Sequence, residues 1–293
     1  MKHTILYTSD LHGNTVQYEK LVRLAFDMSA DSVIIGGDIS PKGFACKSAE
    51  EFITVQREFF ANGLPKLLKP LQDKSQVFIM MGNDDCASNN DVFEKKDTLF
   101  YKIIHDKRLK LTPEFDIVGY SNVPITPFGI KDWEKFDLTT IPPAHASEYA
   151  ARKAANYKMT GLKSSELRWT KFEFSPEMEQ ADSIQKDLSQ KLFTENPDKT
   201  IYVMHSPPDN TKLDQIMTKA HVGSFAIRFF IEENQPYLTL HGHIHETVNI
   251  SGDFRHQIGK TLCMSSGNHN VGEHLAVVVF DAYKPKEAKR IVV

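Results

Sequence analysis

Short apolar runs alternate with segments of helical period along almost the whole chain. Leu21, Leu24 and Met28 repeat with helical spacing, and further helices are expected at 52–59, 183–193 and 224–233. Apolar runs between such helices are typical of the buried strands of an α/β protein. The runs that predict strands are 4–8, 32–35, 77–81, 115–119, 201–204, 237–240, 261–264 and 275–280. The sequence therefore predicts an α/β fold.

Polar side chains of metal-binding types directly follow five of these runs. The stretches are SDLHGN after the first run, GGDIS after the second, GNDD after the third, MHSPP after the fifth and HGHIH after the sixth. Open α/β sheets gather ligand sites at the carboxyl ends of their strands, so we expect these side chains to meet. Gly37, Gly82 and Gly242 each precede a candidate, where the backbone must turn sharply or approach an ion closely. The metal-ligand candidates are Asp10, His12, Asp38, Asn83, His205, His243 and His245.

The chemistry of these donors indicates which ions they bind. Imidazole, carboxylate and amide donors together suit divalent ions of intermediate softness, and the lack of Cys among them argues against a structural zinc site. Mn²⁺ or Fe is favoured, with Zn²⁺, Ni²⁺ or Mg²⁺ as alternatives. If one carboxylate bridges, the candidates divide into two sets of four. Two divalent ions held in this way would share a hydroxide and clamp the oxygens of an in-line displacement at phosphorus.

The order of the motifs resembles the signature of the calcineurin-like metallophosphoesterase superfamily, which runs D-x-H, G-D, G-N-H-D/E, H and G-H-x-H. The matching motifs lie between residues 10 and 245. The resemblance implies a four-layer αββα sandwich, in which two mixed β-sheets are flanked by helices, with a binuclear metal centre at the strand ends. It also implies the ligand sets: Asp10, His12 and His245 for one ion, Asn83, His205 and His243 for the other, and Asp38 as the bridge.

The sequence departs from that signature at GNDD, where Asp84 replaces the usual histidine and Asp85 matches the acidic residue that follows it. An ionised carboxylate beside the phosphoryl group repels a dianionic monoester more than a monoanionic diester. We therefore expect a phosphodiesterase, with Asp38, Asp84 and Asp85 as catalytic candidates. A phosphomonoesterase or a nucleotide pyrophosphohydrolase on the same site is the alternative. Asp84 could also point into solvent and have no role.

Three polar residues near the motifs have other expected roles. His241 lies outside the signature, and we expect it to orient a ligand or a neighbouring loop. Asn14 and His221 are candidates for substrate contacts. His221 is a candidate because the turn before residue 224 begins a predicted helix, and a helix N-terminus attracts anions.

Rival functions are less well supported by the sequence. A protein phosphatase of this superfamily carries an Arg soon after the GD motif, and GDISPKG has none. A nuclease usually needs a basic groove, whereas the chain has a net charge of -3 and no basic run, although short nucleotides stay open as substrates. A non-catalytic scaffold would be expected to have lost ligands, and all the candidates are present. A small phosphoester is therefore the expected partner, and nothing indicates the oligomeric state.

The organisation of the chain is consistent with one domain over residues 1–293. The segment 121–198 has a Pro-rich start and a polar helical stretch, and we expect an insertion that forms a partial cap. Cys46, Cys86 and Cys263 lie far apart and form no C-x-x-C pair, which predicts reduced thiols in a cytoplasmic protein. We expect neither a signal peptide nor a transmembrane segment, because the apolar runs are too short.

Overall fold

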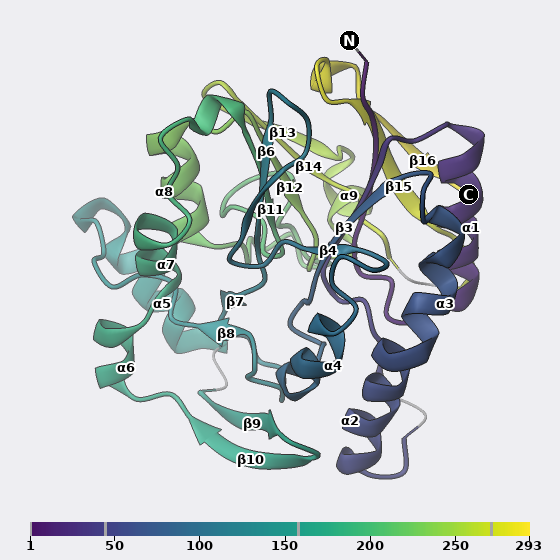
Figure 1. Cartoon of the computed structure of the whole chain (residues 1–293). Helices are drawn as coiled ribbons and strands as arrows, with labels where there is room; N and C mark the ends of the chain where they lie inside the picture. Colours follow the sequence, from purple (N-terminus) through teal and green to yellow (C-terminus); the bar gives the residue numbers. More distant parts are fainter. Residues whose placement is uncertain (1, 44–45, 157–158, 270–271) are drawn as a thin grey trace.

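Two six-stranded mixed sheets form the centre of the molecule in the computed structural model (Figure 1). The structure describes residues 2–43, 46–156, 159–269 and 272–293. The first sheet has the strand order β16 (Lys289–Val292), β15 (Ala276–Asp281), β1 (Thr4–Thr8), β2 (Ser32–Gly36), β3 (Gln76–Met80) and β4 (Lys102–Ile103). The second has the order β13 (Arg255–Ile258), β14 (Thr261–Ser265), β12 (Leu238–His241), β11 (Thr200–Met204), β6 (Asp116–Tyr120) and β5 (Arg108–Lys110).

The inner strands of each sheet run parallel. Strands β1 to β4 are parallel in the first sheet, as are β6, β11, β12 and β14 in the second, whereas β15, β16, β13 and β5 pair antiparallel. A parallel strand covered on both faces is apolar without alternation, and β1, β2, β6 and β11 are buried along their whole length. The carboxyl ends of the parallel strands thus meet at one edge of each sheet.

Three apolar clusters connect the sheets and helices into layers. Side chains alternate along β1, so Leu6 packs with the helices while Ile5 and Tyr7 pack against the other sheet. Helices α1 (Thr15–Asp27) and α3 (Leu64–Leu68) cover the first sheet, and α7 (Ile184–Gln190) and α8 (Phe225–Asn234) cover the second. The predicted four-layer αββα sandwich is confirmed.

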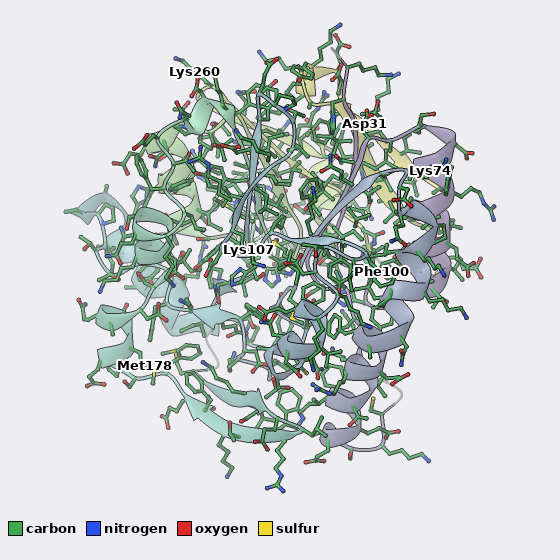
Figure 2. The ribbon with its side chains drawn as sticks, viewed as in Figure 1. Asp31, Lys74, Phe100, Lys107, Met178 and Lys260 are labelled. Carbon is green, nitrogen blue, oxygen red and sulfur yellow. The ribbon has the colours of Figure 1, made fainter. Side chains whose placement is uncertain are left out.

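Charged side chains cover the outside of these layers. Figure 2 shows Lys74 and Lys260 extending away from the ribbon, and both are exposed. Within the described ranges, every helix is too short or too polar to cross a membrane.

The segment 121–198 adds helices and short strands beside the sandwich. It contains β7 (Val123–Pro124), β8 (Glu134–Lys135), α5 (Ala146–Asn156), β9 (Thr160–Ser165), β10 (Arg168–Glu173), α6 (Pro176–Ala181) and α7. Trp133 Nε1 donates a hydrogen bond of 2.8 Å to Asp85 O, which ties the segment to the loop after β3. Strand β10 lies beside α2 (Ala49–Glu58), where Trp169 stacks on Phe52 with ring centroids 6.1 Å apart (Figure 1). The segment therefore contacts the first half of the chain at the loop after β3 and at α2.

Each of the predicted strands is confirmed, with shifts of one residue at some ends. The edge strands β4, β5, β13 and β16 and the β9–β10 hairpin were not predicted. Most of their residues are half-buried or exposed, so they lack the continuous apolar run of a central strand. The short helices α4 (Asn90–Glu94) and α9 (Thr247–Ser251) also lack enough length to show a helical period.

Candidate metal centre

The structure brings the seven predicted ligands together at the strand ends. They come from the loops after β1, β2, β3, β11 and β12, and backbone hydrogen bonds hold these loops against each other. Asp10 N donates to Gly37 O over 3.0 Å, and Gly242 N donates to His205 O over 3.0 Å. In addition, His243 N donates to Asp10 Oδ1 over 3.1 Å, which joins the edges of the two sheets.

Several of these ligands lie on backbone that non-glycine residues rarely adopt. The φ angles are 59° at Asp10, 44° at His12, 52° at Asp38 and 66° at His243, all in the left-handed region. Such conformations persist at functional sites where the surroundings hold them in place. Gly37 has a φ of 104°, and a Cβ there would lie 2.4 Å from His205 Nδ1, so glycine is required at this close approach.

The first group of donors contains Asp10, His12, Asp38 and His245. Each of them places one ligand atom within 4.8 Å of the others. The Nε2 atoms of His12 and His245 are 3.2 Å apart, and His245 Nε2 is 3.3 Å from Asp10 Oδ1. In addition, the buried Nδ1 of His12 has no hydrogen-bond partner. Converging imidazole and carboxylate lone pairs of this kind fit a divalent cation.

The second group shares Asp38 with the first and adds Asn83, His205 and His243. Asp38 Oδ2 is 3.5 Å from His205 Nε2 and 3.8 Å from His12 Nε2, so this oxygen lies between the two groups. Asn83 Oδ1 is 3.1 Å from His205 Nε2 and 2.7 Å from His243 Nδ1. The structure thus places two groups of donors on either side of one carboxylate.

Burial and neighbouring charges shift the pKa values of these groups. Burial lowers the pKa of both His12 and His243 to about 3, so both rings are neutral and offer a lone pair. Burial opposes ionisation of Asp38, but His205 and His12 hold the pKa of this carboxyl well below its usual range. For His205, burial is outweighed by the negative charge of Asp38, which raises its pKa to about 9. A buried carboxylate of this kind needs a positive partner.

Asp85 lies behind the ligands and positions two of their loops. Its carboxylate is fully buried and accepts hydrogen bonds from Ile39 N (3.1 Å), Ser40 N (2.9 Å) and Gly82 N (2.8 Å). These contacts hold the loop after β2, which contains the GD motif, against the loop after β3, which contains the GN motif. Asp85, one of the predicted catalytic residues, therefore holds in place the two loops that carry Asp38 and Asn83.

His241 has the supporting place that the sequence indicates. Its Nδ1–H is directed at the carbonyl oxygens of Met204 (3.1 Å) and Ser206 (3.0 Å), and its Nε2 is 2.8 Å from Thr239 Oγ1. The ring is fully buried beside the start of the loop that carries His205. It therefore orders that loop.

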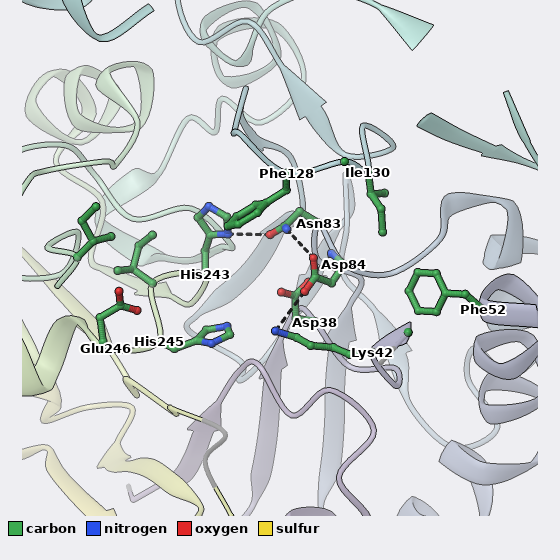
Figure 3. Close-up of a pocket in the computed structure, with 14 residues that line it drawn as sticks. Asp38, Lys42, Phe52, Asn83, Asp84, Phe128, Ile130, His243, His245 and Glu246 are labelled. Carbon is green, nitrogen blue, oxygen red and sulfur yellow. Dashed lines mark hydrogen bonds and ion pairs between the residues drawn. The ribbon is translucent and has the colours of Figure 1, made fainter. Parts of the chain in front are cut away.

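Four of the donors, Asp38, Asn83, His243 and His245, line a cavity of about 480 Å³. Figure 3 shows Lys42 and Asp84 next to Asp38, Phe128 beside His243, and Phe52 at the opposite side. The lining residues are Asp38, Lys42, Gly43, Phe52, Asn83, Asp84, Phe128, Gly129, Ile130, Ile216, His243, Ile244, His245 and Glu246. The loop 128–130 of the segment 121–198 thus forms part of the cavity wall.

Asp84 faces this cavity. Its side chain is 27% exposed, and Oδ2 is 3.4 Å from Lys42 Nζ and 3.8 Å from His12 Nδ1. Burial and the nearby charge of Asp38 raise the pKa of Asp84 to about 6. Lys42 is not among the site residues predicted from the sequence, because a lone lysine in GDISPKG matches no motif of the signature. A cation four residues after Asp38 was the signal that could have found it.

The two candidates for substrate contacts are engaged within the protein. Asn14 caps α1, since its Oδ1 accepts from Gln17 N over 3.2 Å, and its Nδ2 donates to Gly272 O over 3.1 Å. His221 Nδ1 is 2.7 Å from Asp214 Oδ1. Neither of these two described side chains lines the cavity above the donors.

Comparisons with known proteins agree with this fold. Solved structures share the fold at low sequence identity. One crystal structure aligns with a TM-score of 0.61 at 13% identity over 100% of this chain and 99% of that chain. The protein TT1561 of Thermus thermophilus aligns with a TM-score of 0.54 at 15% identity over 99% of both chains. A dimetal phosphatase from Danio rerio, LOC 393393, aligns with a TM-score of 0.51 at 13% identity over 94% of this chain and 91% of that chain.

Sequence comparison identifies the family. Among curated proteins, no sequence matches the chain. The family model described as calcineurin-like phosphoesterase matches residues 3–247, a range that includes every strand-end motif described above. The match covers most of the chain, and the Asp and His cluster that could bind metals lies inside it. The chain therefore belongs to the calcineurin-like phosphoesterase family, whose members depend on two metal ions.

Proposed function

We propose that this chain is a metal-dependent phosphoesterase that prefers phosphodiesters. The observation that carries the proposal is the convergence of two donor sets on Asp38 at the base of an open cavity. Asp10, His12 and His245 would hold one ion, Asn83, His205 and His243 would hold the other, and Asp38 would be shared by both. The mixed donors favour Mn²⁺ or Fe, with Zn²⁺, Ni²⁺ or Mg²⁺ as alternatives. Bound ions of this kind polarise phosphoryl oxygens and lower the pKa of water.

The charges around the cavity support the diester preference. Lys42 is the one Lys or Arg among the described residues that line the cavity, and its Nζ forms an ion pair with Asp84 Oδ2 at 3.4 Å. Glu246 adds a second carboxyl group to the wall. A monoanionic diester meets less repulsion from these carboxylates than a dianionic monoester does. Lys42 then contacts a non-bridging phosphoryl oxygen, while Asp84 selects against the second negative charge of a monoester.

The residues around the centre also bear on the cap, the substrate size and the location of the protein. Phe128, Gly129 and Ile130 bring the segment 121–198 to the cavity, which supports a partial cap inserted into one domain. The cavity is of a size for a small phosphoester substrate. The free thiols of Cys46, Cys86 and Cys263 fit a protein that works in the reducing cytoplasm.

Metal removal tests the proposal most directly. Dialysis of the purified protein against a chelator is expected to remove two ions per chain and to lower the hydrolysis of aryl phosphodiesters by at least about 100-fold. Addition of Mn²⁺ should restore it. Elemental analysis measures the metal, and a panel of aryl phosphate mono- and diesters measures kcat/KM. Full activity of the metal-free protein would refute the proposal, and a preference for monoesters would replace the diesterase with a monoesterase.

Substitution of Lys42 tests the substrate contact. Lys42→Gln removes the cation beside Asp84, so KM for a diester should rise by about 10- to 100-fold, the value of one charge-assisted hydrogen bond. Steady-state kinetics on an aryl phosphodiester measures the change. Lys74→Gln is the matched control, because Lys74 is exposed and lies outside the cavity lining. An unchanged KM in Lys42→Gln would show that the lysine does not contact the substrate.

A further inference from the structure

A second, smaller cavity lies against the first. Its volume is about 180 Å³, and it shares Phe128, Ile216, His243 and Ile244 with the larger cavity above the donors. The loop 124–127 and Val222 form the rest of its wall, together with Gly223 and Arg152. Because His243 belongs to the proposed ligands, a group in the small cavity lies one side chain away from the metal centre. We call this space the side pocket.

The polar groups in the wall of the side pocket are already used by the protein. Arg152 donates from Nη1 to Gly223 O over 2.9 Å and from Nη2 to Asp209 Oδ1 over 2.5 Å, and its guanidinium lies 4.5 Å from the ring centroid of Phe225. The hydroxyl of Thr126 is bonded to Glu134. The remaining wall consists of the His243 ring, the backbone of Gly223, and prolyl, aliphatic and aromatic carbon. The side pocket therefore suits an apolar group, and the guanidinium in its wall, that of Arg152, is already paired with Asp209.

The size of the side pocket limits the group that fits. Its volume is close to the roughly 150 Å³ of an apolar cavity that binds benzene, so it accepts a single six-membered ring or a branched alkyl group of that size. A nucleobase would bring several hydrogen-bonding groups into a wall that leaves them unpaired, which costs affinity. The shared wall places such a ring within reach of a phosphoryl group at the metal centre.

We infer that the side pocket binds a compact apolar group, the size of one ring, on the phosphoester substrate. The inference rests on the proposed function, because it assumes that the phosphoryl group lies at the donor cluster. It narrows the substrate class to phosphoesters with an aryl or branched alkyl substituent close to phosphorus. Phe128 gives this substituent an aromatic wall that both cavities share.

Two phosphinates of equal charge test the side pocket without catalysis, because each is a monoanion, as a phosphodiester is, and has no ester bond. Calorimetry on the metal-loaded protein is expected to give a Kd for benzyl(methyl)phosphinate at least about tenfold lower than that for dimethylphosphinate, because only the benzyl ring reaches the apolar wall. Equal Kd values, in a protein that hydrolyses phosphoesters, would overturn the inference. Failure of the proposed function gives a different result, in which neither phosphinate binds and no ester is hydrolysed.

A variant that fills the side pocket locates the effect. Val222 lines the side pocket and not the larger cavity, so Val222→Phe should abolish the preference for benzyl(methyl)phosphinate while the Kd of dimethylphosphinate stays within about twofold. Val292→Phe is the matched control, because Val292 is 52% exposed on an edge strand. A ring preference that survives in folded Val222→Phe would place the ring elsewhere. The comparison on the unchanged protein stands even if this variant fails to fold.

Discussion

Asp38→Asn is expected to lower kcat/KM for an aryl phosphodiester by about 10³-fold or more and to reduce the metal content below two ions per chain. The substitution keeps the shape of the side chain but removes the charge that lies between His12 Nε2 and His205 Nε2. Both donor sets lose their shared carboxylate at once. Steady-state kinetics and elemental analysis on the same preparation measure the two effects together.

His241→Asn provides the control for this result. Its ring orders a loop through hydrogen bonds to Met204, Ser206 and Thr239, and it is not one of the proposed ligands. The variant should lose about 1 to 3 kcal/mol in the free energy of unfolding and still bind both ions. Wild-type turnover and full metal content in Asp38→Asn would contradict the binuclear centre.

Asp84→His should raise the ratio of monoesterase to diesterase kcat/KM by about tenfold or more. The change removes a negative charge from the cavity, and a histidine can also donate a proton to a leaving group. It frees Lys42 from its partner at 3.4 Å, which adds attraction for a dianion. A charge change of this kind contributes about 1 to 3 kcal/mol to the transition state. Parallel kinetics on one aryl monoester and one aryl diester give the ratio.

Two controls distinguish selectivity from damage in this experiment. The metal content of Asp84→His should equal that of the wild type, because the proposed ligands are unchanged. Asp91→His makes the same replacement at an exposed aspartate that pairs with Arg57, outside the cavity lining, and should leave the ratio unchanged. A flat ratio in Asp84→His with both ions bound would remove the main support for the diester preference.

The parts of the fold that follow from the sequence are the parts that are buried on both faces. Strands β1 and β11 appear as continuous apolar runs because helices cover one face of each sheet and the other sheet covers the second. The edge strands β13 and β16 carry polar residues such as His256 and Arg290, since one side of each is accessible to water. Local sequence alone does not distinguish such strands from loops.

The candidate site also has parts that could be predicted from the sequence and parts that could not. The ligand positions could be predicted because each follows a recognisable strand, as Asp38 follows β2 and His205 follows β11. The roles of residues between the motifs depend on contacts far apart in the chain. Asp85 accepts hydrogen bonds from backbone groups more than 40 residues away along the chain. Likewise, only the assembled cavity shows Lys42 beside Asp84.

The left-handed backbone at Asp10, His12, Asp38 and His243 sets activity against thermal stability. A non-glycine residue in this region carries a cost on the order of 1 kcal/mol, which glycine does not. In the metal-free protein, glycine at these positions would therefore relieve backbone strain while deleting a donor. A laboratory selection that rewards heat resistance alone would enrich such variants, which keep the sandwich and lose the chemistry. Engineering of this scaffold therefore needs a screen for catalysis at every round.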